Sequence, residues 1–154
     1  MNKFSRAAVL FIAQGAYSGK SPYAPGTAGT AVGILLYLGL KNLAPVPYGF
    51  LCVLLCGIGT YAAGKAECIL GRKDSPSIVI DEIVGYLIAM FQVPPTWGFI
   101  IAGFFLFRFF DIVKPWPIYG LQSISGGLGV MLDDIGAAIY TNIALQIAVY
   151  YKIL

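Results

Sequence analysis

The sequence predicts an all-α membrane protein with about five hydrophobic segments and an N-terminal amphipathic helix. Hydrophobic residues make up 58% of the 154 residues and charged residues 11%, whereas soluble domains contain about 25% charged residues. The apolar runs are separated by clusters of Gly, Pro and polar residues, which are typical of turns. Because a chain of this length forms one domain, we expect residues 1–154 to be a single integral-membrane domain.

The N-terminal residues 3–15 are weakly amphipathic. Lys3 and Arg6 lie on this segment, so we expect a helix on the membrane surface with these two side chains at the lipid headgroups. No small-residue cleavage site follows an apolar core here. We therefore expect no cleavable signal peptide.

A loop rich in Gly, Pro and Ser covers residues 19–30 and leads into an apolar run at 31–40. Thr27 or Thr30 is predicted to cap the helix that begins there. A helix N-terminus with free N–H groups and nearby hydroxyls is also a natural phosphate site. Capping is favoured when the loop is considered alone, and both interpretations stay open.

The other apolar segments are bounded by clear turn signals, and they follow in order at residues 48–70, 78–93, 97–110 and 127–154. Residues 48–70 are long enough to span a bilayer. Pro94 and Pro95 end the second of these segments, and Pro115 and Pro117 follow the third. The segments near 27–41 and 78–93 are shorter than the roughly 20 residues of a clean span, so we expect them to thin the bilayer or to be re-entrant.

The distribution of basic residues predicts the topology. If the N-terminus is cytoplasmic and all five segments cross, eight Lys and Arg residues lie inside, and only Lys41 and Lys152 lie outside. This asymmetry agrees with the positive-inside rule. The same topology places all seven acidic residues at the cytoplasmic ends of segments, namely Glu67, Asp74, Asp81, Glu82, Asp111, Asp133 and Asp134.

The most informative stretch is residues 74–85, which carries three carboxylates in nine residues. Asp81 and Glu82 stand inside an apolar run of Ile and Val. Ionised groups in such a setting are costly unless they are paired, hydrated or bound to a metal. The pair therefore predicts a site, while Asp74 and Ser75 are equally well explained as the cap of a helix that begins at Pro76.

Several function classes are excluded. The chain has no histidine, which removes histidine bases, histidine metal ligands and phosphohistidine chemistry. Cys68 and Arg72 are separated by three residues instead of the five of a cysteine-phosphatase loop, and Cys52 and Cys56 are typical of core or lipid-facing positions. A dispersed net charge of +3 does not favour nucleic-acid binding.

Converging carboxylates without histidine or cysteine indicate a site for Mg²⁺, which prefers oxygen ligands. Arg108, Asp111 and Lys114 are spaced to share one side of a helix. Acids can hold the ion while Arg and Lys hold phosphate oxygens, although a salt-bridged helix end explains this trio as well.

The site lies at membrane level, so we expect a lipid headgroup as substrate. The favoured reaction is hydrolysis of a phosphate monoester, by an activated water or by direct carboxylate attack; the sequence does not decide between them.

Four sequence blocks resemble the bacterial phosphatidylglycerophosphatase A family. These blocks are residues 25–30 (PGTAGT), 74–85 (DSPSIVIDEIVG), 107–118 (FRFFDIVKPWPI) and 127–134 (GLGVMLDD). The resemblance implies a Mg²⁺-dependent phosphatase that removes the terminal phosphate of phosphatidylglycerophosphate to give phosphatidylglycerol. It also implies a multi-pass protein of the bacterial cytoplasmic membrane with its active site facing the cytoplasm.

Carried onto this sequence, the resemblance assigns three groups of residues. The catalytic candidates are Asp81, Asp134 and Asp111. The metal candidates are Asp81, Glu82, Asp133 and Asp134, followed by Glu67 and Asp74. The phosphate-binding candidates are Arg108, Lys114, Thr27, Gly29, Thr30 and Lys65.

Two other functions compete with this interpretation. A transferase for CDP-activated lipids requires a motif that begins with Asp-Gly, and this pair does not occur in the chain. A small transporter would use the acids as an ion pathway, but they are expected at one face instead of the midplane. The Gly-rich stretches at 26–33 and 126–136 suit close helix contacts within one chain or between two copies, so a homo-oligomer is also possible.

Overall fold

The computed structural model describes residues 2–121 and 123–153. Within these residues the chain forms seven α-helices and one short 3-10 helix, without any strand, which confirms the predicted all-α class. The elements are α1 (Lys3–Ala13), η1 (Ser18–Lys20), α2 (Pro25–Leu40), α3 (Pro45–Leu70), α4 (Ile80–Ala89), α5 (Trp97–Val113), α6 (Ile118–Leu121) and α7 (Gly127–Tyr150). Met1 and Leu154, the ends of the predicted domain, lie outside the described residues.

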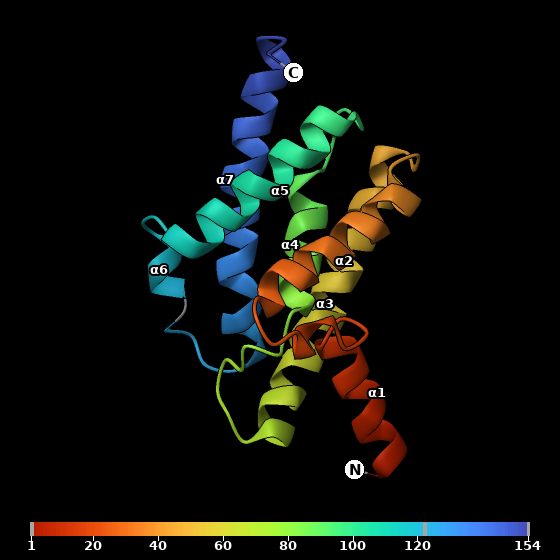
Figure 1. The fold of residues 1–154 in the computed structure, drawn as a ribbon, viewed down its shortest axis with the longest axis vertical. Coiled ribbons are helices and arrows are strands. Elements are labelled where there is room, and N and C mark those ends of the chain that lie inside the picture. The colour runs from red at the N-terminus through yellow and green to blue at the C-terminus, as the bar shows by residue number, and fades with distance from the viewer. Residues whose placement is uncertain (1, 122, 154) are drawn as a thin grey trace.

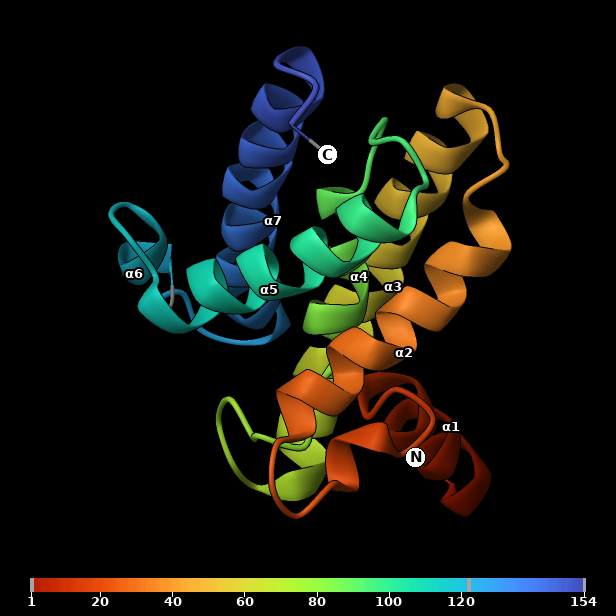
Figure 2. The same ribbon diagram turned by 45° about the horizontal axis from the view of Figure 1, so that its top comes forward.

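The short helix α4 occupies the centre of the molecule. It packs against α2, α3, α5 and α7, and these longer helices surround it in both ribbon views (Figures 1 and 2). Eight of its ten residues are buried. The sequence of α4 is apolar on almost every side, which is typical of a helix enclosed by others.

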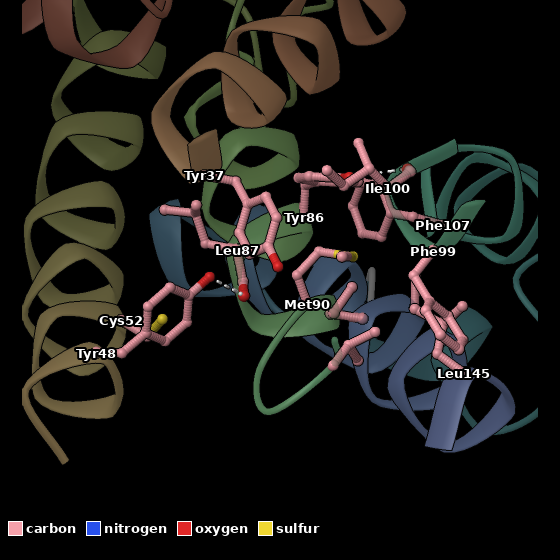
Figure 3. Packing of buried hydrophobic residues seen from close by; sticks show 14 of the residues in the cluster. Tyr37, Tyr48, Cys52, Tyr86, Leu87, Met90, Phe99, Ile100, Phe107 and Leu145 are labelled. Carbon is pink, nitrogen blue, oxygen red and sulfur yellow. Dashed lines mark hydrogen bonds between the residues drawn. The ribbon is translucent and has the colours of Figure 1, made fainter. Parts of the chain in front are cut away.

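Aromatic side chains form the core around α4 (Figure 3). Tyr86 and Phe107 are fully buried there, and the hydroxyl of Tyr48 donates a hydrogen bond of 2.8 Å to the carbonyl of Leu87. Gly85 allows α5 to approach closely, because a Cβ atom at this position would lie 2.7 Å from the Phe107 ring. Packing of this kind holds α4 in one position relative to its neighbours.

The C-terminal end of α4 lies inside the bundle, and side chains of α7 cap it. The Asn142 amide donates hydrogen bonds of 2.9 Å to the carbonyl of Ala89 and 2.8 Å to that of Phe91. Gln146 donates to Phe91 and Gln92 at 3.3 and 3.2 Å. A helix end inside a protein is tolerated when other protein groups satisfy its carbonyls, so these amides explain how such a short helix can end there.

Among the described residues, two helices are long and apolar enough to cross a membrane, judged by length and composition alone. They are α3 and α7. The predicted shortness of the other segments is visible in α2, with 16 residues, and in α4, with 10. At 1.5 Å per residue α4 is about 15 Å long, half the hydrocarbon thickness.

The predicted start of the second helix was wrong. Helix α2 begins at Pro25, with Ala24 as its N-cap, so Thr27 and Thr30 both lie inside the helix. The Thr30 hydroxyl donates to the carbonyl of Gly26 at 2.9 Å instead of capping. Proline is well suited to the first helical position, and Pro25 places the start upstream of both threonines.

The interpretation of residues 74–76 as a helix start was also wrong. Helix α4 begins at Ile80, and Asp74 has a positive φ of 46°, which is typical of a turn.

The predicted N-terminal helix is present as α1, and the Arg6 side chain donates to the carbonyl of Ile69 at the end of α3. Its location on a membrane surface stays a prediction.

Candidate active site

A cavity of about 260 Å³ lies where the N-terminal ends of α2 and α4, the C-terminal end of α5 and the beginning of α7 meet. The loop at residues 74–78 forms one of its walls. Its charged lining residues are Asp74, Asp81, Glu82, Arg108, Asp111, Lys114, Asp133 and Asp134. The structure therefore brings together all three predicted catalytic residues, five of the six predicted metal residues and two of the six predicted phosphate residues.

Three carboxylates converge at the start of α4 and α7. One oxygen from each of Asp81, Glu82 and Asp134 lies within 4.8 Å of the others. Asp81 and Asp134 are buried, and one oxygen of each of the three side chains lacks a hydrogen-bond partner among the described residues. Buried carboxylates without partners are costly, so this cluster, called the carboxylate triad below, fits a hard cation held by oxygen ligands.

A chain of ion pairs continues from the triad along the cavity wall. Arg108 donates to Asp111 at 2.7 Å and lies 3.9 Å from Glu82. Lys114 bridges Asp111 at 3.2 Å and Asp133 at 2.6 Å. Asp111 and Asp133 thus lie within hydrogen-bond distance of bases, whereas the ion pair between Glu82 of the triad and Arg108 is longer. This geometry suits a role of Asp111 and Asp133 in holding Arg108 and Lys114 in place.

The position of Lys114 depends on the end of α5. Lys114 is the C-cap of this helix, with a left-handed φ of 45°, and Pro115 follows it. Burial by itself lowers the pKa of Lys114, but the hydrogen bond to Asp133 and the charges of Asp133 and Asp111 outweigh burial and raise the pKa above its ordinary value. Lys114 is therefore a permanent cation of the site.

The N-terminus of α2 lines the cavity next to the triad. Ala24, Pro25 and Gly26 all line it. A Cβ atom on Gly26 would collide with the Glu82 carboxylate and would lie 2.9 Å from an Arg108 nitrogen. The N-terminus of α2 thus lies directly against the charged side chains of the cavity. The positive end of the helix dipole favours a bound anion at this place.

The remaining phosphate candidates do not line the cavity. Thr27 is exposed, and Gly29 and Thr30 are buried. A Cβ atom on Gly29 would lie 2.6 Å from Val79, so Gly29 serves close packing of α2 against the start of α4. Lys65 is exposed on α3.

Glu67 also stands outside the cavity lining but contacts it indirectly. Its side chain accepts a hydrogen bond of 2.6 Å from the backbone N–H of Asp74. Glu67 therefore fixes the turn that presents Asp74. Gly26 and Ser75 line the cavity but were not predicted as site residues, although both belong to the sequence blocks that carry the resemblance.

The comparisons with known proteins identify the family of this chain. The family described as phosphatidylglycerophosphatase A matches residues 11–149. A relative named phosphatidylglycerophosphatase A from Haemophilus influenzae is 40% identical over 94% of this chain and 91% of its own length. A relative of the same name from Escherichia coli is 36% identical over 83% of this chain and 76% of its own length.

A relative from Bacteroides thetaiotaomicron is 38% identical over 90% of this chain and 92% of its own length, and it carries the provisional name phosphatidylinositol-3-phosphatase. No solved structure matches the chain. The family match covers every residue of the carboxylate triad and of the ion-pair chain. This chain therefore belongs to the phosphatidylglycerophosphatase A family and is a phosphatase.

Proposed function

We propose that this protein hydrolyses the terminal phosphate of phosphatidylglycerophosphate in a Mg²⁺-dependent reaction at the cytoplasmic face of the membrane. The carboxylate triad carries the proposal, since one oxygen from each of its three side chains lies within 4.8 Å of the others, beside the Arg108 guanidinium group. One oxygen of each side chain also lacks a hydrogen-bond partner among the described residues. The carboxylate oxygens suit a small divalent cation, and the guanidinium group suits a phosphate beside it.

Each charged group of the cavity has a role in this proposal. Asp81, Glu82 and Asp134 hold the metal ion, which when bound supplies positive charge opposite the phosphoryl oxygens. Arg108 and the N-terminus of α2 bind the phosphate oxygens. Lys114 keeps the two walls of the cavity together through its ion pairs on α5 and α7.

The chemical step has two routes. In one, a triad carboxylate removes a proton from water, and the water oxygen attacks phosphorus as the bond to the glycerol oxygen breaks. In the other, a carboxylate such as Asp81 or Asp134 attacks phosphorus directly, and water then cleaves the acyl phosphate. In both routes the glycerol oxygen leaves with a proton, and inorganic phosphate is the second product.

The cytoplasmic orientation is supported by charge and by the arrangement of the helices. The predicted topology places eight Lys and Arg residues on the side of the site and two on the other. In Figure 1 the turn between α2 and α3 and the C-terminal end of α7 lie at the end opposite to the N-terminus. Those two places carry Lys41 and Lys152, the two basic residues expected outside.

The experiment that tests the proposal is phosphate release by the purified protein in detergent. Phosphatidylglycerophosphate and phosphatidylinositol 3-phosphate are compared, each with Mg²⁺ and with EDTA. We expect release that requires Mg²⁺ and is faster with phosphatidylglycerophosphate. Release in EDTA would overturn the metal dependence, a preference for the inositol lipid would overturn the substrate, and no release from folded protein would overturn the phosphatase function.

A further inference from the structure

A hydrogen-bonded chain of neutral side chains leads from the end of α1 to the active-site cavity. The Gln14 amide nitrogen lies 3.2 Å from the Ser77 hydroxyl oxygen, and this oxygen lies 3.1 Å from the hydroxyl oxygen of Ser75. Gln14 and Ser75 are 3% and 8% exposed. Ser75 lines the cavity that holds the carboxylate triad.

The Gln14 end of this chain donates, because an amide nitrogen can only donate. Gln14 donates to the Ser77 oxygen, and either hydroxyl can be the donor in the hydrogen bond between Ser77 and Ser75. Where Ser77 donates to Ser75, the hydrogen of Ser75 is left for an acceptor in the cavity. Ser75 is the one neutral hydroxyl among the described residues that line this cavity.

The segment that carries Ser75 is fixed from the same side. The backbone N–H of Val79 donates to the carbonyl of Ala13 at 2.9 Å. Gly19 lies directly against the carbonyl of Ser77, since a Cβ atom there would collide with it. The turn after α1 therefore sets the position of the 74–78 loop.

We propose that the Ser75 hydroxyl donates a hydrogen bond to an oxygen of the phosphorylated headgroup and that Gln14 and Ser77 act as positioning residues through it. This inference rests on the proposed phosphatase function. A neutral donor suits a phosphate, ester or hydroxyl oxygen of the headgroup, whereas the surrounding acids suit the cation. Ser75 thus contributes to substrate recognition beside the metal and Arg108.

The test measures kcat and KM for phosphatidylglycerophosphate with Mg²⁺ in four variants. Ser75→Ala is expected to raise KM about tenfold, as for one lost hydrogen bond to a charged acceptor, while Ser75→Thr keeps KM near the wild-type value. Gln14→Met is expected to raise KM in the wild-type background and to have no effect in the Ser75→Ala background. Ser18→Ala is the matched control, since the Ser18 hydroxyl bonds the backbone of Gln14 and does not line the cavity.

An unchanged KM in Ser75→Ala would overturn the inference while leaving the phosphatase function intact. So would a Gln14→Met effect of equal size in both backgrounds, because a structural role alone predicts that result. Wild-type protein that releases no phosphate would contradict the proposed function instead. In that case calorimetric titration with glycerol 3-phosphate and Mg²⁺ tests Ser75 directly, with about tenfold weaker binding expected for Ser75→Ala and equal binding overturning the inference.

Discussion

Lys114 donates a hydrogen bond of 2.6 Å to Asp133 and thereby joins the end of α5 to the beginning of α7. The same ammonium group lies 3.2 Å from Asp111 on its own helix. One partly buried cation thus holds two acids of the cavity wall, one of which also binds Arg108. The position of the Arg108 guanidinium group, the proposed phosphate ligand, therefore depends on Lys114, although Lys114 itself is one residue beyond α5.

Replacing Lys114 by Met is expected to lower kcat at least tenfold and to destabilise the fold by about 1–3 kcal/mol, because Asp111 and Asp133 each lose one charged hydrogen-bond donor. Lys114→Arg keeps the charge and is expected to retain more of both properties. Turnover and thermal unfolding in detergent are the measurements. Combining Lys114→Met with Asp133→Asn should cost less than the sum of the two single changes, and strict additivity would contradict the coupling.

Removing charge from the carboxylate triad is expected to abolish turnover without unfolding the protein. Asp81→Asn and Asp134→Asn each delete one ligand but also relieve repulsion among buried acids, so stability without metal should be unchanged or higher. Thermal unfolding with and without Mg²⁺ provides a second readout, because stabilisation by the ion should disappear in both variants.

Glu67→Gln is the matched control for the triad variants, since it removes an acid that does not line the cavity and keeps an oxygen that can accept from Asp74. This variant is expected to retain Mg²⁺-dependent turnover. Full activity in Asp81→Asn or Asp134→Asn would remove that residue from the site. Loss of the Mg²⁺ effect in Glu67→Gln would instead restore Glu67 as a metal ligand.

Gly26 provides a test of the space between α2 and the ion-pair network. Alanine in place of glycine within a helix normally stabilises by about 0.5–1 kcal/mol, but here the methyl group would collide with Glu82 and Arg108. Gly26→Ala is therefore expected to reduce kcat/KM at least tenfold. Gly39→Ala on the same helix meets open space and should leave activity unchanged; equal activity of the two variants would refute the close approach.

The sequence was sufficient to predict the all-α class and the convergence of the acids, for reasons that concern single residues. Asp81 and Glu82 are surrounded by Ile and Val, which marks a buried site in any fold. Proline and glycine mark several of the observed helix ends, as Pro45 and Gly71 do for α3. Helix starts were less predictable. Pro25, Thr27 and Thr30 are all suited to the start of a helix, and the sequence does not show which of them begins α2.

The division of labour within the cavity was not predictable from sequence. Asp111 and Asp133 differ from the triad through their distances to Lys114, and these distances depend on how α5 and α7 pack. No sequence pattern marked Ser75 as a site residue, because it resembled a helix cap. None marked Gln14, because its hydrogen-bond partner Ser77 lies 63 residues away. Polar contacts between distant segments leave no periodic pattern in the sequence.

The proposed topology is tested by cysteine labelling in intact bacterial cells. In a background with Cys52, Cys56 and Cys68 replaced by serine, single cysteines are placed at Lys41 and Lys73. A membrane-impermeant maleimide is expected to label the Lys41→Cys variant in intact cells and the Lys73→Cys variant only after permeabilisation. Labelling of both from the same side would contradict the crossing of α3, which joins these two positions.

The amides of α7 hold the end of the ten-residue helix α4, which carries two residues of the candidate active site. Asn142→Leu would leave the carbonyl of Ala89 without its donor and that of Phe91 with Gln146 alone. A buried carbonyl without a partner costs about 1–3 kcal/mol, so thermal stability in detergent should fall by this amount.

Because α4 also carries Asp81 and Glu82, the loss of its C-terminal caps should reach the triad at the other end. Asn142→Leu is therefore expected to weaken the stabilisation by Mg²⁺ as well as the fold. Ile143→Val, one position further on α7 and half exposed, should change neither property by more than about 0.5 kcal/mol. If Asn142→Leu lowered stability but left Mg²⁺ binding intact, the proposed coupling between the two ends of α4 would be contradicted.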